Sequence, residues 1–188
     1  MSALLDSLAQ VDRQLFVAVH QGLAHPLLDT VLPVVREKET WYALYAIFLV
    51  LVIRTHRRRA WIPVLAVVAA VVVSDQLSGI YLKEFFERVR PCRDPALVGH
   101  IRDLVRCSGA FSMPSAHASN HFAVAVSLFS FLPKPRRALV LLLLWAGLIA
   151  FAQVYVGVHY PGDVVVGGVI GALVGGITRT IAGRWLRT

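Results

Sequence analysis

The sequence predicts an all-α integral membrane protein, in which about five transmembrane helices form a bundle preceded by an amphipathic interfacial helix. Of the 188 residues, 57% are apolar and the mean hydropathy is +0.65, whereas soluble domains are nearer half apolar. Apolar stretches recur at about the 20-residue length that crosses the hydrocarbon of a bilayer. The chain length suits one membrane-embedded domain, residues 1–188, with an amphipathic segment 1–36 and a transmembrane core 41–183.

The N-terminal residues 2–22 form the predicted interfacial helix. Its apolar side chains fall on one helical stripe: Leu4, Leu8, Val11, Leu15 and Val19. Acidic residues interrupt the stretch and no basic segment precedes it, so we do not expect a cleaved signal peptide. A short helix at 26–35 then leads into the charged segment 36–39. A single spanning helix within residues 3–35 is the alternative.

The remaining apolar stretches give the five predicted spans: residues 41–53, 60–89, 114–132, 137–155 and 161–179. The first is lengthened at its start by the preceding turn. In the last, small residues recur every four positions in two rows: Gly167, Gly171 and Gly175, and Gly168, Ala172 and Gly176. Such rows let neighbouring helices approach closely, so we interpret these glycines as structural.

Basic residues set the predicted orientation in the membrane. Three clusters follow apolar stretches and contain no acidic residue: Arg54–Arg59, Lys134–Arg137 and Arg179–Arg187. This is the pattern of cytoplasmic loops, and it argues against nucleic-acid binding despite the net charge of +8. With the clusters inside, five spans place the N-terminus, residues 83–117 and residues 153–163 together on the outer side.

The segment Phe111–His121 leads into the third predicted span and forms its start, and it resembles an anion-binding helix start. Pro114 suits the first turn of a helix, and Ser112 or Ser115 can cap its free amides. Those amides form a ready anion site, and His117 stands just inside it. Alternatively, this is a capped membrane helix with an incidental histidine.

Two further segments carry polar residues at the same predicted face. Lys83 and Arg90 are seven residues apart, so a continuous helix would put both cations on one face with Glu87 between them. Snorkelling basic residues at a helix end are the alternative. His159 precedes Asp163 by four residues around a Pro-Gly turn; such a carboxylate can fix the histidine tautomer, or the pair can be a structural cap.

In combination, Lys-x6-Arg-Pro, Pro-Ser-Ala-His and His-x3-Asp resemble the type 2 phosphatidic acid phosphatase superfamily. That superfamily includes lipid phosphate phosphatases, polyprenyl diphosphate phosphatases and vanadium haloperoxidases, and the resemblance covers about residues 41–179. It implies that His159 is a nucleophile that forms a phosphohistidine and is oriented by Asp163. It also implies that His117 protonates the leaving alcohol and later activates water.

The resemblance further implies which groups hold the phosphoryl oxygens: Lys83, Arg90, and the backbone and hydroxyl around Ser115 and Ala116. It implies a reaction that needs no metal or other cofactor. Ala116 replaces the glycine that the family motif has before the histidine, which is a small change.

A larger departure lies in the third motif, which usually opens Ser-Arg where this chain has Ala152-Gln153. A phosphate-binding cation is therefore missing from the pattern. Candidate replacements are Gln153 itself as an uncharged donor, His121 one turn after His117, and the arginines of the loop between the two cysteines: Arg93, Arg102 and Arg106. We expect a loop arginine, since arginine stays charged at all relevant pH values.

Three further polar features have weaker functional interpretations. Asp75 and Gln76 lie at membrane depth, where we expect supporting or packing roles. A metal site at His117 and His121, one helical turn apart, is an alternative. Cys92 and Cys107 flank the outer loop and can form a disulfide in an oxidising compartment.

The resulting functional hypothesis is a membrane phosphatase that hydrolyses a lipid phosphate or polyprenyl diphosphate at the outer face of a bacterial inner membrane. Its expected partners are that substrate and membrane lipids. A phosphotransferase that passes the group to another hydroxyl is one alternative. A non-catalytic relative that binds lipid head groups is the other, and the missing arginine is its best support.

Overall fold

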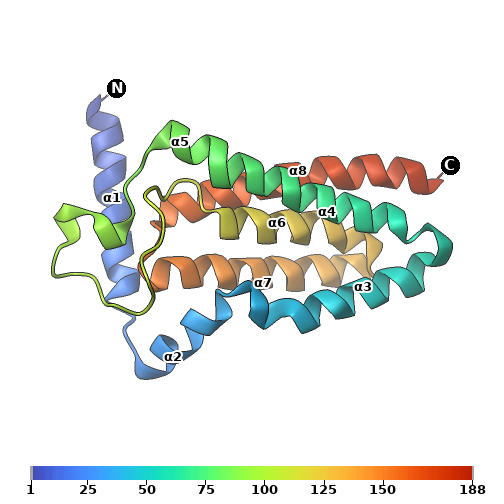
Figure 1. Ribbon diagram of the computed structural model, residues 1–188, viewed down its shortest axis with the longest axis horizontal. Coiled ribbons are helices and arrows are strands. Elements are labelled where there is room, and N and C mark those ends of the chain that lie inside the picture. Colours follow the sequence, from blue (N-terminus) through green and yellow to red (C-terminus); the bar gives the residue numbers. More distant parts are fainter. Residues whose placement is uncertain (1, 188) are drawn as a thin grey trace.

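The computed structural model describes residues 2–187 and confirms the predicted all-α helical bundle. Long helices run side by side along the long axis of the molecule, and α1 crosses one end (Figure 1). The principal helices are α1 (Ser2–His20), α2 (Pro26–Val35), α3 (Tyr42–His56), α4 (Trp61–Gln76), α5 (Leu82–Phe86), α6 (Ala116–Leu128), α7 (Pro135–Tyr155) and α8 (Pro161–Arg187).

Three helical stretches are long and apolar enough to cross a membrane by themselves: Trp61–Phe86, Pro135–Tyr155 and Pro161–Arg187. The other two predicted spans correspond to α3 and α6, which have 15 and 13 residues. Short 3₁₀ turns extend them: η1 (Lys38–Trp41) before α3 and η6 (Phe129–Phe131) after α6. All five predicted spans are therefore helical, with lengths that differ from one another.

The second predicted span ends earlier than expected. A π-helical turn, η3 (Leu77–Tyr81), joins α4 to α5, and Glu87 then closes the helix in a left-handed conformation with φ 45°. Arg90 therefore lies beyond the helix, beside the isolated bridge between Val89 and Phe111. The expectation that Lys83 and Arg90 share one helical face was wrong, because the helix stops between them.

The third predicted span begins later than expected. Its first helical residue is Ala116, and Ser115 is the N-cap, with its hydroxyl accepting a hydrogen bond from the amide of Ala118 at 3.4 Å. Pro114 lies before the cap, after a cis peptide bond, rather than in the first turn. Ser112 instead donates its hydroxyl to the carbonyl of Arg88 at 3.1 Å and so fixes the loop.

One row of glycines brings α8 against α6. A Cβ atom at Gly167, Gly171 or Gly175 would lie 2.0–2.6 Å from a backbone carbonyl oxygen of α6 or its cap. Contact this close excludes any side chain, which is the usual reason for small residues between membrane helices. The second row does not share this role throughout, because a Cβ at Gly176 would meet open space.

The N-terminal segment folds as two helices, separated at residues 21–25, rather than as a single span within 3–35. Leu8, Val11 and Leu15 of α1 are about half exposed, whereas Phe16 and His20 are completely buried. The helix therefore presents an apolar stripe outward and docks its other face, as expected for an interfacial helix.

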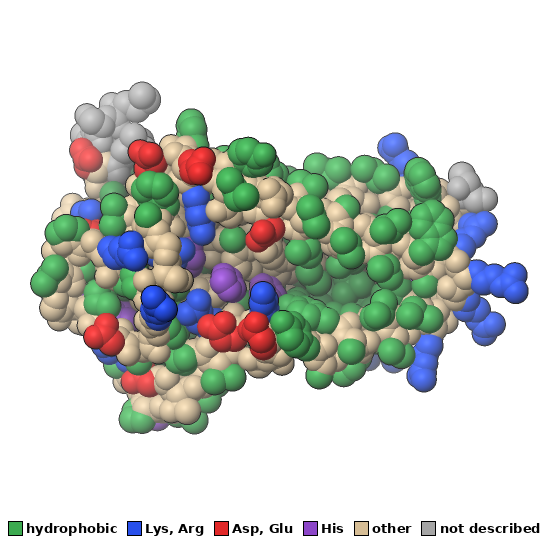
Figure 2. Space-filling view, in the orientation of Figure 1, with side chains coloured by type: hydrophobic (Ala, Val, Ile, Leu, Met, Phe, Trp, Pro, Cys, Tyr) green, Lys and Arg blue, Asp and Glu red, His purple; other side chains and the backbone are tan. Residues whose placement is uncertain are grey.

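The two ends of the bundle differ in composition. The turns at 57–60 and 132–135 lie at the same end as the C-terminus, whereas the loop 87–115 and the α7–α8 turn lie at the other (Figure 1). Basic side chains gather at the first end, and large apolar side chains cover much of the surface between the ends (Figure 2). This arrangement brings the three motif segments to one end of the molecule.

Candidate active site

His159 stands in the short turn between α7 and α8 and is 2% exposed. The carbonyl of Gln153 accepts hydrogen bonds from the amides of Val158 and His159, both at 3.3 Å. Gly157 takes a left-handed conformation with φ 88°, which favours glycine. The turn is thus built by the backbone, and it delivers the imidazole to the interior.

Asp163, in the first turn of α8, is fully buried beside this histidine. Its Oδ2 accepts a hydrogen bond from the amide of Tyr160 at 2.8 Å and lies 3.5 Å from Nδ1 of His159. At 3.5 Å the attraction to the histidine is mainly electrostatic. Catalytic hydrogen bonds are often this long before a substrate binds.

Arg88 holds the other oxygen of Asp163, and the sequence patterns did not single out this residue. Its guanidinium donates to Oδ1 of Asp163 at 2.8 Å, pairs with Asp12 of α1 at 2.7 Å and stacks on the ring of Tyr160. Burial would lower the pKa of Arg88, but the carboxylates of Asp163 and Asp12 outweigh it and raise the pKa.

Asp12 extends this network to the helix that follows the histidine turn. Its Oδ1 accepts a hydrogen bond from the amide of Gly162 at 2.8 Å. The interfacial helix α1 therefore does more than cover the site. It supplies a carboxylate that holds both Arg88 and the start of α8.

The Pro-Ser-Ala-His segment meets this network through its backbone. The amide of Ser115 donates to the carbonyl of Asp163 at 3.0 Å, which joins the start of α6 to the start of α8. Amides in the first turn of a helix have no acceptor within the helix, and His117 is the second residue of α6. Ala116 and His117 both line a cavity of about 660 Å³.

That cavity runs from His117 along three helices toward the other end of the bundle. Figure 2 shows histidine side chains in a hollow edged by acidic and basic groups, next to an apolar hollow. Apart from a few polar groups near the histidines, the lining is mostly apolar and comes from α3, α4 and α6, including Phe48, Leu49, Val52, Val67, Val71, Val124 and Leu128.

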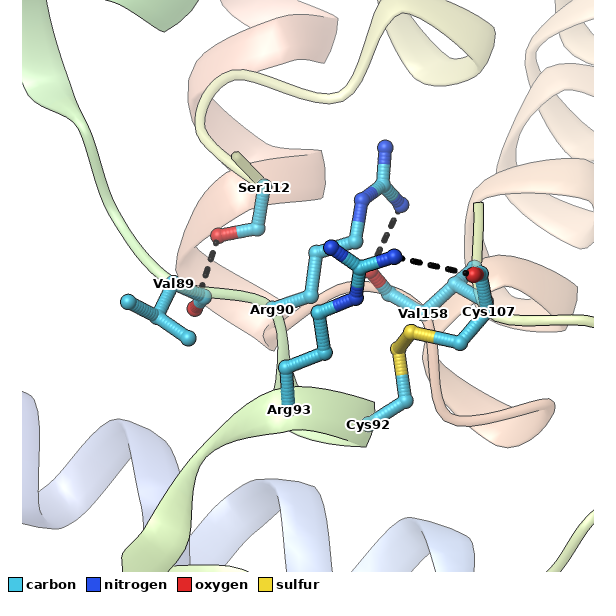
Figure 3. The surroundings of a disulfide bond; sticks show 7 residues. All are labelled: Val89, Arg90, Cys92, Arg93, Cys107, Ser112 and Val158. Atoms are coloured by element: carbon cyan, nitrogen blue, oxygen red, sulfur yellow. Dashed lines mark hydrogen bonds between the residues drawn. A yellow bond between two sulfur atoms is a disulfide. The ribbon is translucent and has the colours of Figure 1, made fainter. Parts of the chain in front are cut away.

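Lys83 and Arg90 both reach the site, although not as neighbours on one helix. The positive charge of each acts on His159, and Lys83 also acts on His117. Arg90 is 8% exposed and donates to the carbonyl of Val158 at 3.0 Å (Figure 3). Its Nε is buried without a hydrogen-bond partner among the described residues.

The electrostatic surroundings keep His159 neutral. Burial lowers its pKa to about 4, and the cations of Arg90 and Lys83 act in the same direction, while the Asp163 carboxylate opposes them. A neutral imidazole has a free electron pair on one nitrogen, which is the form required of a nucleophile or a base.

His121 lines the same cavity as His117, but neighbouring groups hold its ring, which argues against a role as a phosphate ligand. Its Nδ1 bonds to the carbonyl of His117 at 2.7 Å, and its Nε2 lies 3.1 Å from the hydroxyl of Tyr45. Both ring nitrogens are therefore engaged. Within residues 2–187, no three His, Cys, Asp or Glu side chains are arranged to hold a metal ion.

The loop arginines are mostly occupied elsewhere. Arg102 pairs with Asp29 at 2.6 Å and lies over the ring of Tyr155, and Arg93 donates to the carbonyl of Cys107 at 3.4 Å. Arg106 lines a separate cavity of about 480 Å³. The structure gives Arg102 a role in holding the loop, which argues against it as a phosphate ligand.

A disulfide joins Cys92 and Cys107 and closes the loop beside Arg90 and Arg93 (Figure 3). Gln153 is completely buried, and neither atom of its side-chain amide has a hydrogen-bond partner among the described residues. Asp75 accepts a hydrogen bond from Asn120 at 2.8 Å and lines the apolar cavity. This contact fits the expected supporting role of Asp75.

The chain is similar to several known phosphatases. The PAP2 superfamily matches residues 60–187. A lipid A 4'-phosphatase of Bacteroides thetaiotaomicron is 29% identical over 182 residues, 95% of this chain and 80% of that protein. A decaprenylphosphoryl-5-phosphoribose phosphatase of Mycobacterium tuberculosis is 32% identical over 129 residues, 68% of this chain and 64% of that protein.

Among solved structures, a transmembrane PAP2-type phosphatidylglycerolphosphate phosphatase of Bacillus subtilis has the same fold. The TM-score is 0.74 at 22% identity, and the match covers 95% of this chain and 87% of that one. Since the family match spans more than half of the residues and includes all three motif segments, the chain belongs to the PAP2 superfamily.

Proposed function

We propose that this protein is a membrane-embedded lipid phosphatase that works through a phosphohistidine at His159 and needs no metal. The observation that carries the proposal is the buried pair of His159 and Asp163, which faces the cations of Lys83 and Arg90. A neutral imidazole with an adjacent carboxylate and two phosphate-binding cations is suited to nucleophilic attack on phosphorus.

In the first step, Nε2 of His159 attacks the phosphorus atom while the bond from phosphorus to the lipid oxygen breaks. His117, whose protonated form is favoured by the adjacent phosphate dianion of the bound substrate, donates a proton to that oxygen, so the lipid leaves as a neutral alcohol. Asp163 stabilises the proton that remains on Nδ1 of His159. The phosphoryl group is then bonded to His159, and its oxygens lie against Arg90, Lys83 and the first amides of α6.

In the second step, the neutral His117 accepts a proton from water, and the oxygen of that water attacks phosphorus. The bond from phosphorus to Nε2 breaks, which releases inorganic phosphate and returns His159 to its neutral form. His117 is then protonated again, as it was before the first step. Atoms and charges balance over the cycle without a further reactant.

The apolar cavity supports a lipid substrate. It begins at His117 and continues between α3, α4 and α6, where it can take a hydrocarbon chain while the phosphate stays with the histidines. The relatives named above act on lipid A and on a decaprenylphosphoryl sugar phosphate. We infer a lipid phosphate for this chain, with polyprenyl diphosphates as a further substrate class to test.

The basic clusters indicate which side of the membrane the site faces. The clusters Arg54–Arg59 and Lys134–Arg137 lie at the end opposite to His159, and such clusters mark the cytoplasmic side. We therefore infer that the site faces the outer side of a bacterial inner membrane. The Cys92–Cys107 disulfide is consistent with an oxidising compartment there.

The experiment is phosphate release by the purified protein in detergent micelles containing EDTA. The substrates are phosphatidic acid, phosphatidylglycerolphosphate, lipid A, and a polyprenyl monophosphate and diphosphate. We expect release from at least one of them without an added acceptor. Transfer of the phosphoryl group to an added hydroxyl acceptor, without release of inorganic phosphate, would identify a phosphotransferase instead. No turnover of any substrate by the folded protein would overturn the proposal.

A further inference from the structure

Arg36, the residue that follows α2, is a mostly buried cation whose ion pair with Glu37 is long. Its side chain is 12% exposed, and its Nε is buried without a hydrogen-bond partner among the described residues. The Nε of Arg36 pairs with a carboxylate oxygen of Glu37 at 3.6 Å, which is too long for a hydrogen bond, and the Glu37 side chain is half exposed. A buried guanidinium in this state is costly unless something else completes its contacts.

Arg36 lies next to residues that line the active-site cavity. The next two residues, Glu37 and Lys38, line the same cavity as His117. The charge of Arg36 acts on His117, and it also acts on Arg90. Arg36 is therefore within electrostatic range of both His117 and Arg90, although the three residues come from segments that are far apart in the sequence.

Packing and a hydrogen bond hold the backbone before Arg36, which limits the positions that the guanidinium can reach. Val35 packs against the buried cluster that includes Ala152 and Tyr155 of α7. Its carbonyl accepts a hydrogen bond from the indole of Trp41 at 2.8 Å. Arg36 thus stands beside the end of α7 where the uncharged Gln153 is buried.

Electrostatics favours an anion among these groups. Burial lowers the pKa of both Arg36 and Arg90. The positive charge of Arg36 also lowers the pKa of Arg90, whereas the carboxylate of Glu37 opposes the shift of Arg36. Both nevertheless remain protonated, since arginine does not lose its proton in proteins. A dianionic phosphoryl group between them would remove the repulsion and accept the hydrogen bonds that both Nε groups lack.

We propose that Arg36 is a ligand of the reacting phosphoryl group, which it contacts from the α2 end on the side of His117. This role rests on the proposed phosphatase function and extends it to a segment outside the three motifs. It is an alternative to the expected loop arginine: Arg102 is bound to Asp29, Arg93 donates to the carbonyl of Cys107, and Arg106 lines a separate cavity. In this arrangement Gln153 needs to supply no charge.

The test compares Arg36→Gln, Arg36→Lys and Arg58→Gln, the last being a matched loss of one positive charge at the far end of the bundle. Two quantities are measured: kcat/KM for phosphatidic acid, or for the preferred lipid of the panel, and the dissociation constant of inorganic phosphate by titration calorimetry. Arg36→Gln should weaken phosphate binding at least tenfold and lower kcat/KM about 10²–10³-fold, the typical effect of one preorganised donor. Arg36→Lys should recover part of both, and Arg58→Gln should change neither.

The two readouts separate this inference from the proposed function. Turnover and phosphate binding within twofold of wild type in Arg36→Gln would overturn the role of Arg36 and leave the phosphatase intact. Phosphate binding that depends on Arg36, in a wild-type protein that hydrolyses no lipid, would retain the ligand and overturn the phosphatase.

A measurement on the wild-type protein covers the case in which the substitutions unfold it. Phenylglyoxal modifies arginine side chains, and the modified residues are located by mass spectrometry. Saturating inorganic phosphate should protect Arg36 at least fivefold and leave Arg58 unprotected. Equal modification of Arg36 with and without phosphate would contradict the proposal.

Discussion

The arginines on the two walls of the site differ in how far carboxylates of the protein neutralise them. On the wall formed by the α7–α8 turn, Arg88 is bound to the carboxylates of both Asp163 and Asp12. On the wall formed by the end of α2 and the loop after α5, Arg36 and Arg90 each keep a buried Nε without a hydrogen-bond partner among the described residues. Arg36 has a long ion pair with the half-exposed Glu37. One wall is neutralised by the protein, and the other is left with an excess of positive charge.

The difference indicates which cations hold the site together and which are available to bind the phosphate of a substrate. An arginine that is paired with buried carboxylates is already committed, and removing it would leave those carboxylates uncompensated. An arginine without such partners is available to a phosphate, for which its planar fork is suited. Arg88 and Arg90 are two residues apart, yet they belong to different walls and should behave differently when changed.

The largest effect is expected at His159, the proposed nucleophile, on the wall formed by the α7–α8 turn. His159→Ala should lower kcat by about 10⁴-fold or more, as removal of a nucleophile does in other enzymes, because no phosphohistidine can form. Phosphate release in detergent measures this, with the thermal midpoint as a check of folding. Turnover near the wild-type rate would show that another residue is the nucleophile.

The next effect concerns orientation on the same wall. Asp163→Asn should lower kcat about 10²-fold or more, through loss of the carboxylate that favours the correct tautomer. Arg88→Gln should lower kcat about tenfold with KM nearly unchanged, because Arg88 acts through Asp163. Arg13→Gln is the control, since Arg13 pairs with Asp94 instead. A rise in KM without a fall in kcat for Arg88→Gln would indicate that Arg88 binds the substrate and does not act through Asp163.

On the wall that includes Arg90, the guanidinium of Arg90 should contribute more to catalysis than the side-chain amide of Gln153. Arg90→Gln should lower kcat/KM about 10²–10³-fold, whereas Gln153→Ala should lower it about tenfold at most. The comparison uses the same lipid for both variants. Equal losses would mean that the amide of Gln153 is itself a primary phosphate ligand.

The smallest effect is a pH dependence of stability that comes from two buried histidines. Burial lowers the pKa of His159 to about 4, and it also lowers the pKa of His20. Below pH ~6.5 the unfolded chain binds protons that the folded protein does not, so stability should fall as the pH decreases from about 7 toward 4. Thermal unfolding between pH 7 and 5 measures the trend. His159→Gln should flatten it, and an unchanged slope in that variant would contradict the assigned burial effect.

Local patterns in the sequence determined the helices and the family. Runs of apolar residues predict membrane helices because a bilayer requires a fixed length of apolar side chain. His159 and Asp163 were found together because their contact closes within four residues and needs no knowledge of distant segments. The row containing Gly167 was likewise identified as a helix contact from its spacing alone.

Tertiary structure decided the roles of the cations, because charge pairing joins segments that are far apart in the chain. The left-handed Glu87 ends α5 and sends Arg88 toward Asp163, 75 residues away, while Arg90 turns to the carbonyl of Val158. Spacing within Lys-x6-Arg carries no information on either contact. Arg36 reaches the site only because α2 packs against the end of α7, and packing between distant helices has no local signature in the sequence.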